Sequence, residues 1–208
     1  SIVAIGSWSG VSGNGSVSIY QNTNETWTQV GEDITGQNLD DNFGKSISLS
    51  ADGSVLAVCA PWNNGNGTNS GHVRMYRNSN GNWSQIGEDI YGEAAGDGTG
   101  YPGRGVSLSS DGSVVAISAD GNDGNGNNSG HVRIFKNISD NWIQVGSDID
   151  GEAAGDNSGV SISLSNDGSI VAIGAPYNDG NGVDSGHVRI YQNVNNIWTQ
   201  VGSDIDGE

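Results

Sequence analysis

The sequence predicts an all-β protein of about four repeated blades, a β-propeller whose repeats of roughly 56 residues each supply four strands. The hexapeptide Gly71–Tyr76 recurs at 130–135 and 186–191, and a degenerate copy stands at 15–20, so the copies start 56, 59 and 56 residues apart. Each unit holds four short segments rich in β-branched residues, separated by Gly, Asn, Asp and Ser, as in strands joined by turns. No apolar period of 3.6 residues persists long enough for a helix. Four-stranded units of this length are typical of propeller blades; a β-solenoid or β-prism is the alternative.

The second unit shows the expected strands most clearly. We expect an innermost strand at 46–49, a second strand at 55–60, a third at 72–76 and an outer strand that begins at Trp83. The pair Asp52-Gly53 lies between the first two strands and predicts a type I′ hairpin, which needs positive φ at both central residues. The second strand is apolar on both faces, so we expect it to lie between two neighbouring blades.

The third strand alternates, with His72 and Arg74 on the same face. We expect these side chains to bond neighbouring blades or acidic loops, because the His and Arg recur with the repeat. The first unit has Ser16 and Ser18 at these positions, so the fold does not require them. An enzyme usually gathers different residues at one unique site. The lone Cys59 is best explained as a small buried residue, and we predict no enzymatic activity.

One domain, 1–208, accounts for the chain, with blades at approximately 1–36, 37–92, 93–151 and 152–208. The N-terminal blade starts at Ser1, Ile2, Val3, Ala4 and Ile5 and lacks its innermost strand. Three explanations remain open: a segment of a longer propeller or array, a slot filled by a strand from another molecule, or a four-bladed ring that tolerates a short blade. Strand addition at the exposed edge formed by these five residues would generate a filament if repeated head to tail.

Charge excludes several partners. The chain has seven Lys and Arg and 24 Asp and Glu, which gives a net charge of −17. Proteins that bind nucleic acids or anionic membranes need a basic surface. No apolar run is long enough to cross a membrane, so no membrane insertion is expected. The partners we expect are proteins, including a second copy, with glycans as a further possibility.

Three segments, 43–49, 56–61 and 70–76, resemble the FG-GAP repeat of integrin α-subunit propellers, and Gly174-Ala175-Pro176 reproduces its Gly-Ala-Pro element. The Phe-Gly pair survives once, at Phe43-Gly44; Arg104-Gly105 and Ser158-Gly159 replace it in later units. The resemblance implies an extracellular or cell-surface propeller used for adhesion or partner binding.

The resemblance also implies a calcium loop of the type Asp-x-Asp-x-Asp-Gly between the first two strands. Here that place holds only Ser50–Ser54 and its copies, and one carboxylate cannot supply the six to eight oxygens that calcium takes. Two other clusters are candidates: the loops at 122–125 and 178–181 with Asp184, whose Asn and Asp also suit turns, and an acidic group that follows the outer strand of the third blade. That group consists of Asp148, Asp150, Glu152 and Asp156. No other cofactor is expected.

Loop residues are the remaining candidates. Trp8, Trp62 and Tyr177 follow the second strand of their units and are predicted to contact a ligand or partner. The outer-strand tryptophans (Trp27, Trp83, Trp142, Trp198) are predicted to anchor adjacent blades, with a sugar platform as the alternative. Six Asn-x-Ser/Thr sequons are candidate N-glycosylation sites: Asn14, Asn24, Asn66, Asn82, Asn127 and Asn137.

These observations together predict a non-enzymatic, extracellular structural or adhesive module that self-assembles into an array or filament by sharing a strand at the incomplete blade. The alternative function is a carbohydrate-binding module that uses the loop aromatics.

Overall fold

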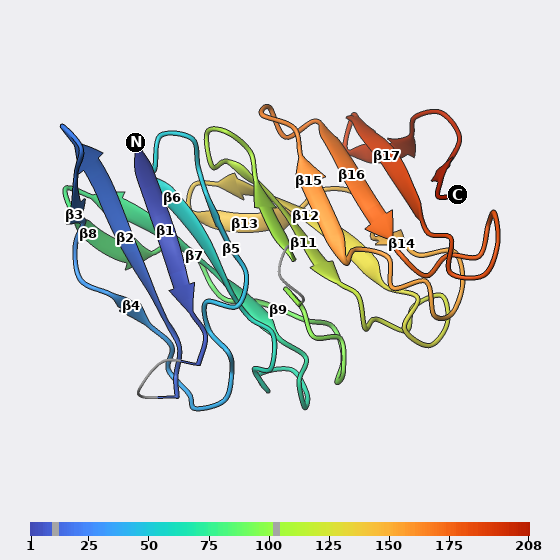
Figure 1. Cartoon of the computed structure of the whole chain (residues 1–208), viewed down its shortest axis with the longest axis horizontal. Helices are drawn as coiled ribbons and strands as arrows, with labels where there is room; N and C mark the ends of the chain where they lie inside the picture. Colours follow the sequence, from blue (N-terminus) through green and yellow to red (C-terminus); the bar gives the residue numbers. More distant parts are fainter. Residues whose placement is uncertain (10–12, 102–104) are drawn as a thin grey trace.

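Four antiparallel sheets stand in a row in chain order in the computed structural model, which describes residues 1–9, 13–101 and 105–208. Figure 1 shows the first sheet (blue) at one end of this row and the last (red) at the other. Within the described ranges every regular element is a strand, so the all-β prediction is confirmed. The same residues contain no helix able to span a bilayer. Arg104, which replaces the Phe of the Phe-Gly pair, lies outside the described residues.

Each sheet is one blade, and its strands follow one another from the inside outward. The first blade contains β1 (Ile2–Ser7), β2 (Ser16–Thr23), β3 (Thr26–Gln29) and β4 (Ile34–Thr35). The second contains β5 (Ile47–Leu49), β6 (Val55–Ala60), β7 (His72–Ser79), β8 (Asn82–Gln85) and β9 (Ile90–Tyr91). The third contains β10 (Val106–Leu108), β11 (Val114–Ala119), β12 (His131–Ile138), β13 (Asn141–Gln144) and β14 (Ile149–Asp150). The fourth contains β15 (Ser161–Leu164), β16 (Ile170–Ala175), β17 (His187–Val194), β18 (Ile197–Gln200) and β19 (Ile205–Asp206).

The blades have one strand more than the four expected. In each complete blade a two-residue strand returns to the start of the third strand; β9 pairs with β7 so that Tyr91 faces His72 and Ile90 faces Val73. Two residues are too short to show a strand period, but the isoleucine is buried against the next blade in the first three blades. The first blade has four strands because it has no counterpart of β5, as predicted.

The type I′ turns lie at a different hairpin from the one predicted. At Asp52-Gly53 only the glycine has positive φ, because the Asp52 carboxylate caps the turn by accepting from the Ser54 backbone N–H (2.9 Å) and the Ser50 hydroxyl (2.7 Å). The two-residue loops between the third and fourth strands have positive φ at both positions, as at Asn24-Glu25 and Ser139-Asp140. An asparagine side chain stabilises each of these loops. At the third blade, for example, Asn137 Oδ1 accepts from the Asp140 N–H (2.9 Å). The loop Asn80-Gly81 carries the Asn-Gly signature, and side-chain capping takes the place of that signature in the other three loops.

The core consists of three hydrophobic clusters, each between two adjacent blades. All six residues of β6 are buried: Leu56 and Val58 pack toward the first blade, whereas Ala57 and Cys59 pack toward the third. This confirms the prediction that the second strand lies between blades. Each blade therefore has a forward face, which packs on the following blade, and a back face, which packs on the preceding one.

Candidate functional site

Polar groups line each junction between blades at one end of the third strand. The loop after the short last strand of one blade supplies a Gln or Glu, at positions 37, 93 and 152. The next blade supplies a His and an Arg from its third strand and an Asp that precedes its own last strand. These residues recur because the repeat does, but each set is shared by two blades.

The first junction is organised around an arginine. Arg74 donates to Asp89 from Nε (2.8 Å) and Nη2 (2.7 Å) and to Oε1 of Gln37 in the loop that joins the first and second blades (2.9 Å). His72 is buried beside them, with Nδ1 4.0 Å from Asp89. Burial, reinforced by the Arg74 guanidinium and opposed by Asp89 and Asp41, lowers the pKa of His72 to about 4. As predicted, the arginine bonds the adjoining loop and an acidic residue; the prediction is not confirmed for His72, whose two ring nitrogens have no hydrogen-bond partner among the described residues.

The other two junctions carry glutamate in place of glutamine. In the second, His131 Nδ1 lies 3.8 Å from both Glu93 and Asp148, and Arg133 donates to the Tyr91 carbonyl (2.7 Å). In the third, His187 Nδ1 lies 3.9 Å from Glu152 and 3.7 Å from Asp204. The ligand atoms of each trio, His with two carboxylates, lie within 4.8 Å of one another.

Sequence reasoning missed Glu93, Asp89 and Asp204 as partners of the histidines. The available signal was the Gly-Glu or Gly-Gln pair that follows each short last strand, at 92–93, 151–152 and 36–37.

The four acidic residues predicted as a calcium group lie at different places. Asp148 and Glu152 belong to the two separate trios. Asp150 lies near Asp148; burial first and the Asp148 charge second raise its pKa. Asp156 is buried and accepts from the Asn178 amide (2.9 Å) and the Ala153 N–H (3.1 Å).

The pair Asp156–Asn178 links the third and fourth blades, and Asp41–Asn63 (2.6 Å) links the first and second. The second candidate loops use their asparagines for turn geometry: Asn122 Oδ1 accepts from Gly124 N–H (2.8 Å), and Asn178 Oδ1 from Gly180 N–H (2.9 Å). Asp184 has positive φ, and its N–H donates to Asp179 (2.9 Å).

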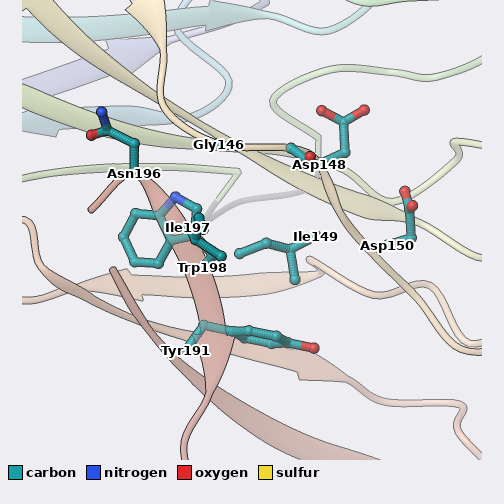
Figure 2. Close-up of a pocket in the computed structure, with 9 residues that line it drawn as sticks. Gly146, Asp148, Ile149, Asp150, Tyr191, Asn196, Ile197 and Trp198 are labelled. Atoms are coloured by element: carbon teal, nitrogen blue, oxygen red, sulfur yellow. The ribbon is translucent and has the colours of Figure 1, made fainter. Parts of the chain in front are cut away.

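Three of the four outer-strand tryptophans anchor adjacent blades, as predicted, whereas Trp27 in the first blade is 51% exposed. The indole N–H groups of Trp83, Trp142 and Trp198 donate to carbonyls of the preceding blade at 3.1, 3.3 and 2.9 Å. Beside each lies a groove of about 390, 320 and 330 Å³, respectively. Figure 2 shows the last groove, with the rings of Trp198 and Tyr191 on one side and the carboxylates of Asp148 and Asp150 on the other.

The three loop aromatics are exposed to solvent, as a contact role requires. Trp62 is 44% and Tyr177 53% exposed. The Trp8 ring is engaged within the protein: the Lys45 ammonium lies 3.6 Å from its centroid and 5.8 Å from that of Tyr101. Trp62 and Tyr177 are therefore the more accessible candidates.

The sequon asparagines differ in accessibility. Asn24, Asn66, Asn82 and Asn127 are exposed, whereas Asn14 and Asn137 are half-buried. The amide nitrogen of Asn66 donates to the carbonyls of Gly92 (2.8 Å) and Glu93 (3.0 Å), and that of Asn14 donates to Gly36 (3.2 Å).

The two end blades expose the faces that inner blades bury. On the forward face of the fourth blade, Val188 is 38% and Ile205 60% exposed, whereas the equivalent Val132 and Ile149 are 0% and 6% exposed. On the back face of the first blade, Ile5 is 53% exposed, whereas the equivalent Val58 is fully buried. The predicted edge Ser1–Ile5 lies in this blade: β1 (Ile2–Ser7) is the first strand of its sheet and, among the described residues, pairs with β2.

Comparison with known proteins supports the resemblance. An FG-GAP repeat model matches residues 142–191. Comparison with curated protein sequences found no significant match. Among solved structures, the chain is similar to a putative 6-phosphogluconolactonase from Bacteroides uniformis (TM-score 0.60, 14% identity, 93% of this chain and 49% of that chain). It is also similar to an acylaminoacyl peptidase from Pyrococcus horikoshii (TM-score 0.50, 12% identity, 97% of this chain and 30% of that chain).

These likenesses establish the fold, a β-propeller, and nothing about activity. The chain spans about half the length of the first of these structures and less of the second.

Proposed function

We propose that this chain, which carries an FG-GAP repeat on β-propeller blades, is a non-enzymatic extracellular module with a structural or adhesive role, and that it associates with further copies through its end blades. The observation that carries the proposal is the pair of apolar faces on the first and fourth blades. Contiguous exposed apolar surface marks interaction sites in soluble proteins.

The two open faces correspond to the two sides of one interface. At every internal junction the forward face of one blade packs on the back face of the next. The fourth blade offers an open forward face and the first blade an open back face. A second copy placed head to tail would therefore reproduce a contact that the chain already makes three times. Such a contact is heterologous, and its repetition generates an array or filament.

The face extends the contact expected at the Ser1–Ile5 edge. Strand sharing would add a fifth strand beside β1 (Ile2–Ser7), where the backbone groups of an edge strand can pair with another chain. Face packing adds burial of Ile5 and Trp27, which are 53% and 51% exposed. Each apolar side chain fully buried contributes about 1.5–3 kcal/mol, so a few such residues favour association.

Location and chemistry support the same role. FG-GAP repeats are typically extracellular, and a net charge of −17 favours solubility. The His and Arg side chains that recur in each complete blade are used between blades, which leaves them unsuited to a unique catalytic centre.

The experiment is a dilution series by analytical ultracentrifugation on the purified 208-residue chain. We expect head-to-tail oligomers that dissociate on dilution, and loss of association in Ile205→Asp. The matched control is Ile143→Asp, which changes an isoleucine that is 51% exposed on the outer strand of the third blade, away from both open faces. A monodisperse monomer at every concentration would overturn the self-association.

The exposed Trp62 and Tyr177 favour carbohydrate binding as a second candidate function. Aromatic rings in loops can stack on sugars, and the acidic chain suits neutral or amino sugars. A glycan array with native chain and a Trp62→Ala variant tests this; an array without hits removes the candidate.

A further inference from the structure

Two blade junctions each direct a buried imidazole at two carboxylates. In the second junction His131 Nδ1 is 3.8 Å from Glu93 Oε2 and 3.8 Å from Asp148 Oδ2. In the third, His187 occupies the same place relative to Glu152 and Asp204. Each trio brings its three ligand atoms within 4.8 Å of one another.

Both imidazoles are buried, and their Nδ1 atoms have no hydrogen-bond partner among the described residues. The His131 side chain is 1% exposed and that of His187 3%. A buried nitrogen without a partner is destabilising, and two carboxylates that face it add mutual repulsion. A bound cation would satisfy the nitrogen and both carboxylates together.

We propose that the trio Glu93, His131 and Asp148 binds a divalent transition-metal ion, with Zn²⁺ the best fit, and that Glu152, His187 and Asp204 form a second, weaker site of the same kind. One imidazole nitrogen and two carboxylate oxygens match the donors that Zn²⁺ takes, with water as a fourth ligand. Tetrahedral bonds of about 2.0–2.1 Å place ligand atoms roughly 3.4 Å apart. The two separations of 3.8 Å between the imidazole nitrogen and the carboxylates, and an oxygen–oxygen separation within 4.8 Å, therefore have to close by about 1 Å or less on average. Calcium, which takes oxygen ligands, fits poorly.

The neighbouring arginines determine which of the two sites binds the metal ion more tightly. At the first site Arg133 approaches Glu93 Oε1 (3.6 Å), while Oε2 faces the histidine. Asp148 Oδ1 accepts from Gln144 (2.6 Å), while Oδ2 faces the histidine. One oxygen of each carboxylate is thus left for a cation.

At the second site Arg189 occupies more of the ligand set. It donates to both oxygens of Asp204, at 3.1 and 3.2 Å, and also pairs with Glu152. A metal ion must displace part of this ion pair, so we expect it to bind less tightly here.

The first junction of the chain is a built-in negative control. It keeps His72 and Asp89, but Gln37 replaces the glutamate and accepts from Arg74, which also holds Asp89 in a bidentate pair. With one carboxylate, already engaged, this junction should not bind the ion.

The proposal is independent of the proposed adhesive function and is tested on the full 208-residue chain with Zn²⁺ alone as the probe. Isothermal titration at about 0.15 M salt, where loose binding to the acidic surface is screened, should give two sites per chain. Glu93→Gln should weaken the tighter site at least about tenfold. That variant reproduces the composition of the first junction, which the fold already accommodates.

His131→Ala should abolish the tighter site, and the matched His72→Ala should leave both sites intact. Imidazole ¹⁵N NMR supplies a readout that loose surface binding would not move: Zn²⁺ should shift Nδ1 of His131 and then of His187, but not of His72. Absence of binding, identical titrations of Glu93→Gln and the native chain, or unchanged histidine signals would each overturn the proposal.

Discussion

Replacing one isoleucine at two equivalent positions tests how much stability each blade face contributes. Ile149 and Ile205 occupy the same position of the repeat, each between two aspartates in the short last strand of its blade. Their local pairing is the same, since Val132 faces Ile149 and Val188 faces Ile205. They differ in exposure, 6% against 60%, because only Ile149 is covered by a following blade.

The expected costs follow from that difference. Ile149→Ala removes a buried side chain and leaves a cavity, at a cost of about 2–4 kcal/mol in the free energy of unfolding. Ile205→Ala removes a side chain that is less than half buried, which should cost about 1 kcal/mol or less. With an m-value of roughly 2 kcal/mol/M, the difference separates the urea midpoints by about 1 M.

The assay is urea unfolding followed by tryptophan fluorescence and circular dichroism at low protein concentration. Coincident curves from the two probes are required before free energies are compared. Equal costs at low concentration would refute the reasoning, because local strand propensity rather than coverage by the next blade would then set the stability. A cost of Ile205→Ala that rises with protein concentration would instead show that association covers this face.

Three further predictions follow from described contacts. Burial lowers the pKa of His72 to about 4, so near and below pH 6.5 the unfolded chain binds a proton that the folded chain does not. The contribution of His72 to the free energy of unfolding should therefore fall by about 2 kcal/mol between pH 7.5 and 5. In His72→Asn the urea midpoint should depend less steeply on pH. Gly151→Ala would drive a Cβ into the carbonyl of Ser129 and cost about 1–3 kcal/mol, whereas Gly174→Ala meets only ordinary contacts and should be nearly neutral in thermal unfolding. In a glycosylating host, glycopeptide mass spectrometry should find Asn24 occupied more than Asn66, whose amide donates to two carbonyls; equal occupancy would contradict this.

The fold could be predicted because the same pattern of strands and turns recurs in each repeat. The alternation of the third strand and the apolar faces of the second strand follow from a period of two residues, and β6 (Val55–Ala60) and β7 (His72–Ser79) are where it placed them. The short last strands were missed because two residues carry no period. Three of the type I′ turns lack the Asn-Gly or Asp-Gly signature, since a neighbouring side chain such as Asn137 stabilises the positive φ values at Ser139-Asp140; the fourth, Asn80-Gly81, carries the signature and was overlooked.

The candidate metal trios could not be predicted from the sequence, for a different reason. Glu93 and His131 are 38 residues apart, since Glu93 lies in the loop that joins the second and third blades and His131 in the third strand of the third. Pattern reasoning compares equivalent positions between repeats, so it aligns Glu93 with Glu152 rather than with the histidine that it approaches. The acidic run from Asp148 to Asp156 looked like one group, but the chain crosses from one junction to the next within it.

The matched FG-GAP segment, residues 142–191, spans a junction between two blades and not a single blade. It starts in the outer strand of the third blade and ends in the third strand of the fourth. The segment therefore contains two contacts of the junction between the third and fourth blades: Glu152 with Arg189, and Asp156 with Asn178. A repeat unit of this kind therefore supplies contacts between two blades as well as strands of each, so each added unit brings part of a junction with it.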